Sequence, residues 1–536
     1  MKYTITQPIL TTLIEEYTNL HDQFPPKLDE STSSEFCFTL VSTWLSECKS
    51  YHPLCKSFED GLVFDNDQLE SRLPTRLIEV GSADGMQEPR LVDIADLEIK
   101  GGGPRYIALS HRWGSTHLLT TTLGTIGAHR STIPLATMPR TFRDAIVITR
   151  RLGIQFLWID SLCIIQDSSS DWKSESLRMQ NIYNFAHLTI SAAHSTDSSS
   201  GCFRPRRGQL SRWIPYYCED KEIPSFEYCL VPRDPYHDPT TTDADKEPLY
   251  KRGWVLQEQL LSRRTLVYSY NGLRWECLTA RGSESMPKLM EHADPNDSSP
   301  RWTINGLQRF VLTDGKKDHH RMWLDIVEDF CCRDLTIAQD ALAAIAGVAN
   351  SMARVYGMDY LAGLWKQHLG KGLLWQLVQN DGLSLQDIGE DDRFGKIAPS
   401  WSWASASRKV KWTGDRVGLV RQTILIEVLD TQGFDSALSS VGSITLRGRA
   451  QKHKHYQSSY FPDCLSKSTT PQTSVLVFFV DKIASNHSYN TDPTIFTCLV
   501  LVPSEVDGAW QRVGLAKEKI SEAEYLSLEI MDIIIV

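Results

Sequence analysis

Three cysteines and a histidine near the amino terminus are the residues whose types and spacing suggest metal chemistry. Cys48 and His52 stand four positions apart, which places them on one face of a helix. Cys55 follows closely, and Cys37 lies upstream. Thiolate and imidazole groups are usual zinc ligands, but the sequence holds no Cys-x-x-Cys pair and offers no evident fourth ligand. We therefore expect these side chains to serve packing, not to converge on one point, and to hold no metal.

Glu175 is a second candidate because it is a carboxylate on an otherwise apolar helix face. The residues that share its stripe in a helix beginning near Trp172 are Trp172, Met179, Ile182, Tyr183 and Ala186. Such a carboxylate is costly unless it is paired or hydrogen-bonded. Two interpretations stay open: a capping or ion-pair role with Arg178 or Arg143, and a catalytic role opposite a developing positive charge. We expect Glu175 to face the sheet, near the loop that begins at Ser110.

Polar side chains follow two predicted strands at the points where the strands end. Ser110 and Trp113 follow the first of these strands, and Asp160 and Gln166 follow the second. Ligands of parallel α/β sheets bind beyond the carboxyl ends of the strands, and their pockets combine polar and aromatic groups. We predict a ligand-binding pocket that these four residues form together with Trp172. In the alternative, Asp160 and its neighbours only cap the edge of the sheet.

An alternation of strands and helices positions these residues. Apolar runs at 106–110, 154–159 and 188–193 predict strands. The segments between them predict helices, one of which opens at Pro139 and stops at Gly153. This rhythm predicts a doubly wound, mainly parallel sheet.

The rest of the chain adds three regions to this α/β core. We predict a helical amino-terminal segment at 1–71, the α/β domain at 72–280, a linker and helical region at 281–400, and a β-rich region at 401–536. Residues 281–300 have the composition of a linker or flexible loop. Trp401 and Trp403 alternate with serines, which predicts a half-buried strand that packs two indoles.

Composition narrows the classes of function. The formal net charge is −10, and no block of five or more basic residues occurs, which argues against a nucleic-acid partner. No signal peptide and no membrane-spanning run is evident, so we expect no membrane span. Twelve cysteines in 536 residues are too sparse for a disulfide scaffold. We expect reduced thiols and a cytoplasmic protein.

Three blocks of the sequence resemble the fungal heterokaryon-incompatibility (HET) domain family. They are YIALSHRWG (Tyr106–Gly114), the run from MPRTF to TISAA (Met138–Ala193), and RGWVLQEQLLSRRTLVYSYNGLRWEC (Arg252–Cys277). Segments on either side also resemble HET proteins, namely WLSECKSYHPLC, CRDLTIAQDALAAIAGVA, YLAGLW and APSWSWAS. The pair His111-Arg112 departs from the family pattern, which more often has an aromatic and a small residue there.

The resemblance implies a role in nonself recognition and in programmed cell death of fused incompatible cells. HET domains are distantly similar to Toll/interleukin-receptor (TIR) domains, some of which cleave NAD, so the resemblance implies a TIR-like fold. If the chain cleaves NAD, Glu175 would stabilise the ribosyl cation. Ser110 and Asp160 would then position ribose hydroxyls, while Trp113 or Trp172 would stack on a base. NAD would be a substrate, and no bound cofactor is expected.

Two other classes of function stay open. The first is a non-enzymatic interaction module that associates with itself and recruits protein partners in incompatibility signalling. The second is an auxiliary or regulatory protein of a metabolic gene cluster. A pocket needs convergent polar groups, whereas an adaptor needs only an exposed patch. The sequence leaves open whether the protein is an enzyme.

Overall fold

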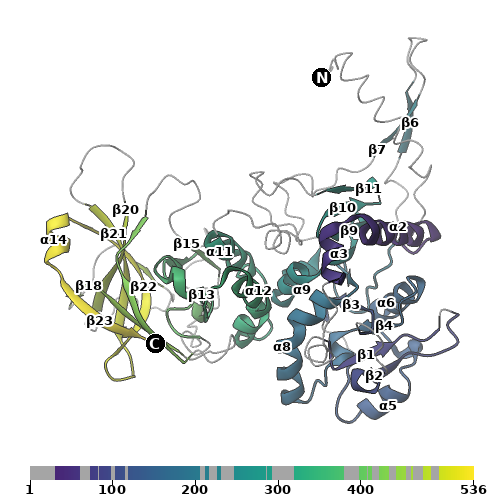
Figure 1. Cartoon of the computed structure of the whole chain (residues 1–536), viewed down its shortest axis with the longest axis horizontal. Coiled ribbons are helices and arrows are strands. Elements are labelled where there is room, and N and C mark those ends of the chain that lie inside the picture. Colours follow the sequence, from purple (N-terminus) through teal and green to yellow (C-terminus); the bar gives the residue numbers. More distant parts are fainter. Residues whose placement is uncertain are drawn as a thin grey trace. The chain divides into compact units, whose positions relative to one another are not determined.

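A computed structural model shows how the chain folds (Figure 1). It describes residues 31–60, 73–82, 84–97, 103–114, 119–205, 212–216, 226–230, 247–284, 286–291, 319–378, 398–406, 409–412, 422–433, 442–453, 460–462, 475–483 and 494–536. The chain divides into two compact units. Unit 1 comprises Met1–Tyr250 and Glu258–Gly315, and unit 2 comprises Lys251–Gln257 and Lys316–Val536. The four-region division drawn from the sequence stays a proposal.

Unit 1 is built on a nine-stranded sheet with the order β11-β10-β9-β8-β5-β3-β4-β1-β2. The strands are β1 (Arg76–Glu79), β2 (Arg90–Asp93), β3 (Tyr106–Ser110), β4 (Phe156–Trp158), β5 (Leu188–Ser191), β8 (Arg264–Ser269), β9 (Gly272–Cys277), β10 (Ala280–Ser283) and β11 (Met286–Glu291). The three strands predicted from apolar runs are β3, β4 and β5, and they lie in this one sheet as predicted.

The sheet is mixed, which corrects the prediction of a mainly parallel sheet. Strands β4, β3, β5 and β8 are parallel neighbours at its centre. The remaining pairings, β1 with β2 and β4 on one side and β8 to β11 on the other, are antiparallel. Short connections such as Tyr270-Asn271 join the outer strands, and a tight hairpin can only link antiparallel neighbours. The α/β rhythm therefore describes the centre of the sheet and not its edges.

Two helices follow the central strands and place the polar loops. Helix α6 (Arg140–Arg151) begins after Pro139 and ends before Gly153, whose φ is +68°, as the sequence predicted. Helix α8 (Ser169–Phe185) begins after Ser168, whose hydroxyl accepts a hydrogen bond from the backbone N–H of Asp171. The phenol of Tyr106 in β3 donates to the carbonyl of Ile182, 2.6 Å away, and fixes α8 on the sheet.

The amino-terminal helices α2 (Glu35–Tyr51) and α3 (Pro53–Asp60) pack on the other end of the sheet, beside β9 and β10 (Figure 1). The rings of Trp44 and Trp275 lie 6.3 Å apart, and the Trp44 indole donates to the carbonyl of Pro287 at 2.6 Å. The described part of the predicted helical segment is thus helical. The prediction of a linker or flexible loop at 281–300 is wrong for residues up to Glu291, because β10 and β11 extend the sheet there.

Smaller elements complete unit 1. They are α5 (Ile126–Ser131), α7 (Asp160–Cys163), the hairpin of β6 (Arg212–Tyr216) and β7 (Phe226–Leu230), and the last part of α9 (Gly253–Leu261). Helix α7 is the one that bears on the candidate site, since it starts directly after β4.

Unit 2 begins with helices and buried tryptophans. Its helices are α11 (His319–Phe330), α12 (Ala341–Tyr356) and α13 (Leu369–Gly372), and its short strands are β12 (Tyr360–Leu361), β13 (Leu364–Trp365), β14 (Trp375–Leu377) and β15 (Val410–Trp412). Trp401 and Trp403 are buried, as predicted. However, Trp403 opens a 3-10 helix that spans Trp403–Ala406, so the strand predicted for this pair is wrong.

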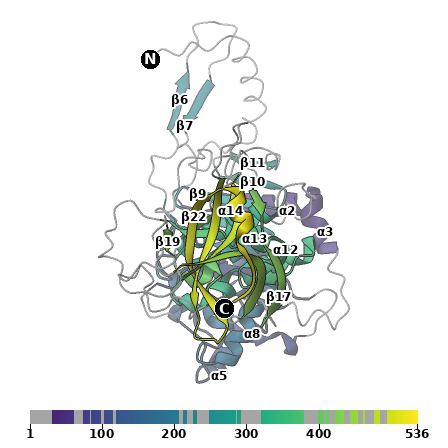
Figure 2. The ribbon, with the colours of Figure 1, turned by 90° about the vertical axis from the view of Figure 1, so that its left-hand side faces the viewer.

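The end of the chain is β-rich, as predicted. Its elements are β16 (Gln422–Ile424), β17 (Glu427–Gln432), β18 (Ser443–His453), β19 (Tyr460–Pro462), β20 (Val475–Ile483), β21 (Thr494–Pro503), β22 (Ala509–Ile520), α14 (Glu522–Ser527) and β23 (Glu529–Ile535). Because β18 pairs with both β20 and β23, the strands β18-β20-β21-β22-β23 close on themselves (Figure 2). Closure leaves few unpaired strand edges. No helix in the described ranges is long and apolar enough to cross a membrane.

Candidate functional site

Asp160 links the two loops that follow β3 and β4. It is the first residue of α7, at the carboxyl end of β4. The indole N–H of Trp113 donates to Asp160 Oδ2 at 2.8 Å, and Nδ1 of His111 lies 3.8 Å from Asp160 Oδ1. The same Oδ1 accepts the backbone N–H of Ser161 at 2.7 Å. The loops therefore meet at one carboxylate, at the edge of the sheet where the sequence placed the pocket.

Gln166 holds the loop after β4 from within. Its amide Nε2 donates to the carbonyls of Asp160 at 3.2 Å and Ile164 at 3.0 Å. Its backbone N–H donates to the carbonyl of Thr121 at 2.8 Å. These bonds give Gln166 a positioning role for Asp160, whereas a ligand-contacting role stays a proposal.

Two serine hydroxyls at this edge are buried without a hydrogen-bond partner among the described residues. Ser110 ends β3 and lies in register with Ser191 of β5. Ser161 follows Asp160. The side-chain oxygens of Ser110 and Ser161 are both buried and unpaired. A buried hydroxyl left unpaired typically costs about 1–3 kcal/mol, so these are groups with which a polar ligand would interact favourably.

Glu175 is buried on the inward face of α8, as predicted, and its carboxylate is held from two sides. Its predicted position near the loop that begins at Ser110 stays a prediction, because its contacts are with Thr75 and Arg178. Oε1 accepts a hydrogen bond from the Thr75 hydroxyl at 2.5 Å, and Oε2 accepts the Thr75 backbone N–H at 3.4 Å. The guanidinium of Arg178 lies 3.8 Å from Oε1 and also donates to the Thr75 hydroxyl. Burial raises the pKa of Glu175, and Thr75 and Arg178 offset part of that rise. These contacts match the ion-pair interpretation with Arg178.

An arginine from β1 connects Glu175's surroundings to the loop after β4. The Arg76 Nη2 lies 2.6 and 2.5 Å from the two carboxylate oxygens of Asp171 in the first turn of α8. Its Nε donates to the carbonyl of Cys163 at 2.8 Å, and Asp171 accepts the backbone N–H of Ile165 at 2.8 Å. Sequence reasoning missed this network because Arg76 and Asp171 are 95 positions apart.

Trp172 differs from the rest of its stripe. Helix α8 begins three residues earlier, so this indole lies in the first turn and is 37% exposed. Glu175, Met179, Ile182 and Tyr183, further along the same face, are buried. The spacing of Trp172 predicted a buried position on the same helix face as Met179, but its indole is partly exposed.

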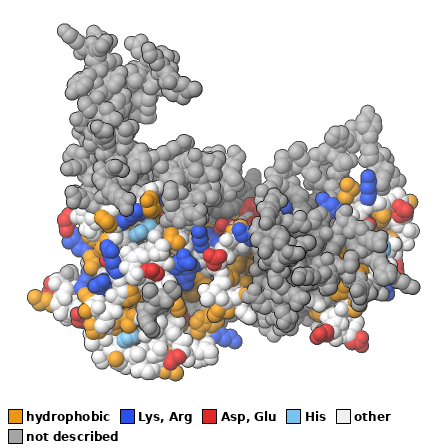
Figure 3. Space-filling model, turned by 180° about the vertical axis from the view of Figure 1, so that it is seen from behind, with side chains coloured by type: hydrophobic (Ala, Val, Ile, Leu, Met, Phe, Trp, Pro, Cys, Tyr) orange, Lys and Arg blue, Asp and Glu red, His pale blue; other side chains and the backbone are white. Residues whose placement is uncertain are grey.

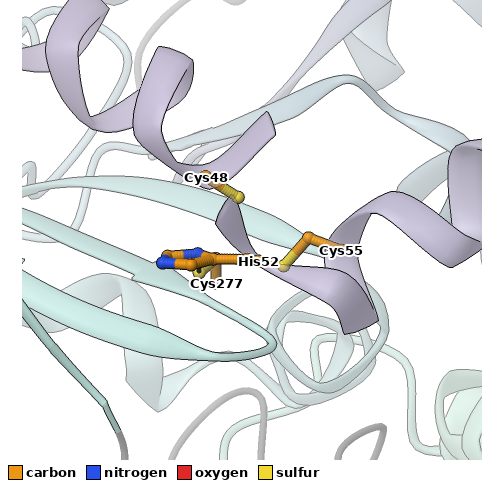
Figure 4. A group of neighbouring side chains, drawn as sticks. All are labelled: Cys48, His52, Cys55 and Cys277. Carbon is orange, nitrogen blue, oxygen red and sulfur yellow. Dashed lines mark hydrogen bonds between the residues drawn. The ribbon is translucent and has the colours of Figure 1, made fainter. Parts of the chain in front are cut away.

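The cysteines and histidine of the amino-terminal helices converge, which corrects the expectation that they stay apart. The ligand atoms of Cys48, His52, Cys55 and Cys277 all lie within 4.8 Å of one another (Figure 4). Cys37 is not a member, and its sulfur lies 3.8 Å from the carbonyl of Ser31. The sequence hid this group because its fourth member stands 225 positions after His52, on β9.

The four side chains also affect one another's protonation. Hydrogen bonding to Cys48 and then Cys55 raises the pKa of His52 to about 9. Hydrogen bonds from Cys277 and Cys48 hold the pKa of Cys55 well below its ordinary value, while burial raises that of Cys277. The group thus favours both an anionic sulfur and a nearby positive charge.

Comparison with known proteins finds a family match for a segment that lies mostly in unit 1. Residues 106–258 match the family model described as Heterokaryon incompatibility protein (HET). The match starts at β3, includes the loops around Asp160 and all of α8, and ends within α9. It agrees with the resemblance that the three sequence blocks carry. No curated protein and no solved structure matched the chain.

Proposed function

Since residues 106–258 form a HET domain, we propose that this protein acts in heterokaryon incompatibility as an effector or signalling protein that leads to cell death after nonself recognition. The observation that carries the proposal is the HET match itself, which covers the three parallel strands β3, β4 and β5 and the loops at their carboxyl ends. That edge is where folds of this kind place their ligand sites.

Inducible expression of the full chain in a fungal host tests this proposal. We expect loss of viability after induction, compared with cells that carry the empty vector. Such a loss would show that the protein kills the cells that express it. Cells that accumulate folded full-length protein and keep normal viability, alone and when fused with an incompatible strain, would contradict the proposal.

A second proposal concerns the mechanism, namely that the HET domain cleaves NAD in a TIR-like way. It is supported by a buried carboxylate, Glu175, on a helix whose first turn is tied through Asp171 to the loop after β4. The unpaired hydroxyls of Ser110 and Ser161 supply hydrogen-bonding groups at the same edge. In this mechanism the carboxylate stabilises the positive charge that develops on the ribose as the bond to nicotinamide breaks.

The competing mechanism is a non-enzymatic module that associates with itself and recruits protein partners. It is supported by the contacts of Glu175, since pairing with Thr75 and Arg178 gives the carboxylate a structural role. The two mechanisms differ in NAD consumption. We expect Glu175→Gln to reduce NAD loss in induced cells by about 10²–10³ if the carboxylate is catalytic, the usual cost of removing one preorganised electrostatic group.

Measuring NAD and viability in the same cultures separates the outcomes. Killing with constant NAD in the wild type supports the interaction module and excludes NAD cleavage. NAD loss that persists in a folded Glu175→Gln protein would show that another group carries the chemistry. The matched control is Glu522→Gln, which removes an exposed carboxylate paired with Lys482 in unit 2 and should leave both readouts unchanged.

A further inference from the structure

Four metal-binding side chains meet between the amino-terminal helices and the sheet of unit 1. Cys48 lies in the last turn of α2, His52 directly follows that helix, Cys55 lies in α3, and Cys277 ends β9. Figure 4 shows the side chains pointing toward one another from these separate elements. Cys48, Cys55 and Cys277 are fully buried, and His52 is 7% exposed. Elements far apart in sequence thus supply one closed set of donors.

The donor set and its spacing fit a single zinc ion. Zinc–sulfur bonds are about 2.3 Å long, so sulfurs around one tetrahedral ion lie roughly 3.5–4 Å apart. All four ligand atoms here lie within 4.8 Å of one another, and His52 Nδ1 is 3.2 Å from the Cys277 sulfur. Soft thiolates with one imidazole favour zinc over magnesium or calcium. We propose that Cys48, His52, Cys55 and Cys277 bind one structural Zn²⁺ as a Cys₃His site.

The surroundings of the sulfurs suit metal-bound thiolates. The Nε of Arg264, a fully buried arginine, donates to the Cys48 sulfur at 3.2 Å. The backbone N–H of Ala280 donates to the Cys277 sulfur at 3.3 Å. Three thiolates and one Zn²⁺ leave a net charge of −1, and the Arg264 guanidinium balances it. Groups of this kind around the ligands orient them and tune the metal.

The site is structural because it is closed and lies away from the candidate ligand pocket. The protein supplies all four ligands of a tetrahedral ion, which leaves no open coordination position. Cys277 is in register with Arg264, the first residue of β8, and β8 runs parallel to β5. The metal therefore lies at the amino edge of the parallel strands, whereas Ser110 and Asp160 follow their carboxyl ends. Its role is to fasten α2 and α3 to β9.

Zinc content of the purified full-length chain tests the proposal. We expect about one zinc per chain in the wild type and a loss of most of it in Cys277→Ser. The matched control is Cys37→Ser, which changes another buried cysteine of the same helix α2 and should retain the full zinc content. Folded wild-type chain from zinc-supplemented cells with less than about a tenth of an equivalent would overturn the site. So would a Cys277→Ser chain that keeps its zinc, or a disulfide found among the three cysteines.

A second measurement on the wild type covers the case in which Cys277→Ser does not fold. Replacing zinc by Co²⁺ should give the strong visible bands of a tetrahedral site and a near-ultraviolet thiolate-to-metal band. Removing the metal with a chelator should lower the melting temperature, because ion binding to the folded chain adds to its stability. A cobalt-treated chain without thiolate bands, or a melting temperature that chelation leaves unchanged, would overturn the proposal.

Discussion

At the scale of single residues, the sequence predicted which polar residues lie at the candidate site, but not all the residues that hydrogen-bond to them. Asp160 and Trp113 were expected at one site because each follows a predicted strand, and the structure joins them directly. Thr75, which holds Glu175, was missed because a threonine before a short strand carries no distinctive pattern. Types and local spacing identify a chemically unusual residue, but its partners come from other elements and depend on the fold.

The protonation of Glu175 leads to a prediction for Glu175→Gln. Burial raises the pKa of Glu175 in the folded chain above its ordinary value. Glu175 therefore contributes stability that is fully present below the ordinary pKa of a glutamate and is lost as pH rises through the elevated folded value. Glutamine has no charge to bury, so the melting temperature of Glu175→Gln relative to wild type should be higher at pH 7 than at pH 4.

Thermal melts of both proteins at the two pH values check this expectation. The exposed pair of Lys482 and Glu522 provides the control, since removing a surface ion pair by Glu522→Gln typically changes stability by less than about 1 kcal/mol. A Glu175→Gln protein that is less stable relative to wild type at pH 7 than at pH 4 would show that ionised Glu175 stabilises the fold through Thr75 and Arg178.

At the scale of elements, the sequence predicted the centre of the sheet and missed strands at both margins, β1 and β2 at one and β10 and β11 at the other. Strand β3 is a nearly continuous apolar run, and every residue of β3 and of β5 is buried. Strands β10 and β11 were missed because their residues, which include Arg281, Ser283 and Lys288, resemble a loop in composition. The pairing of β10 with β9, and of β11 with β10, makes them strands. Cys277, the fourth member of the cysteine and histidine cluster, was missed for a similar reason. The pairing of β9 with β8 places it beside α2, and no local pattern predicts that.

The turn of this hairpin gives a prediction at the element scale. Gly272 has a φ of +116°, and a Cβ added there would meet a carboxylate oxygen of Glu284 at 1.9 Å. Gly272→Ala should therefore destabilise unit 1 by about 1–3 kcal/mol, mainly because an alanine is strained at this φ. The carboxylate end of the buried Glu284 side chain must also shift to make room. Gly153 also has a positive φ, +68°, but a Cβ there would meet nothing within 4 Å.

Comparing the two alanine variants separates the cost of a left-handed φ alone, at Gly153, from the combined cost of a φ of +116° and the contact with Glu284 at Gly272. Gly153→Ala should cost only about 1 kcal/mol, the usual strain of a left-handed alanine. Denaturant unfolding of the full chain, followed by a probe of unit 1 such as tryptophan emission, measures both. Equal losses of unfolding free energy in the two variants would contradict this account. They would show that the backbone at Gly272 and its contact with Glu284 add no cost beyond that of a left-handed alanine.

At the scale of the whole molecule, composition indicated the class of protein but not its activity. The net charge of −10 argued against a nucleic-acid partner, and that exclusion stays a prediction. On the face of unit 1 in Figure 3, hydrophobic side chains stand among polar and charged ones. Residues 106–258 match the HET family model, but that match names neither a partner nor a substrate. This is why the choice between an enzyme and an adaptor needs a measurement.

The central claim is that the loops at the carboxyl ends of β3 and β4, within the segment that matches the HET family, are needed for killing in cells. Viability of fungal cells induced to express Asp160→Asn tests it most directly. Oδ2 of Asp160 accepts a hydrogen bond from Trp113 and Oδ1 accepts one from Ser161, and asparagine replaces one of these oxygens by an NH₂ group that cannot accept. The control is Asp532→Asn, which alters an exposed ion pair with Arg447 in unit 2. We predict that wild type and Asp532→Asn kill, whereas Asp160→Asn at equal abundance does not. Killing by a folded Asp160→Asn chain at the wild-type rate would contradict the claim.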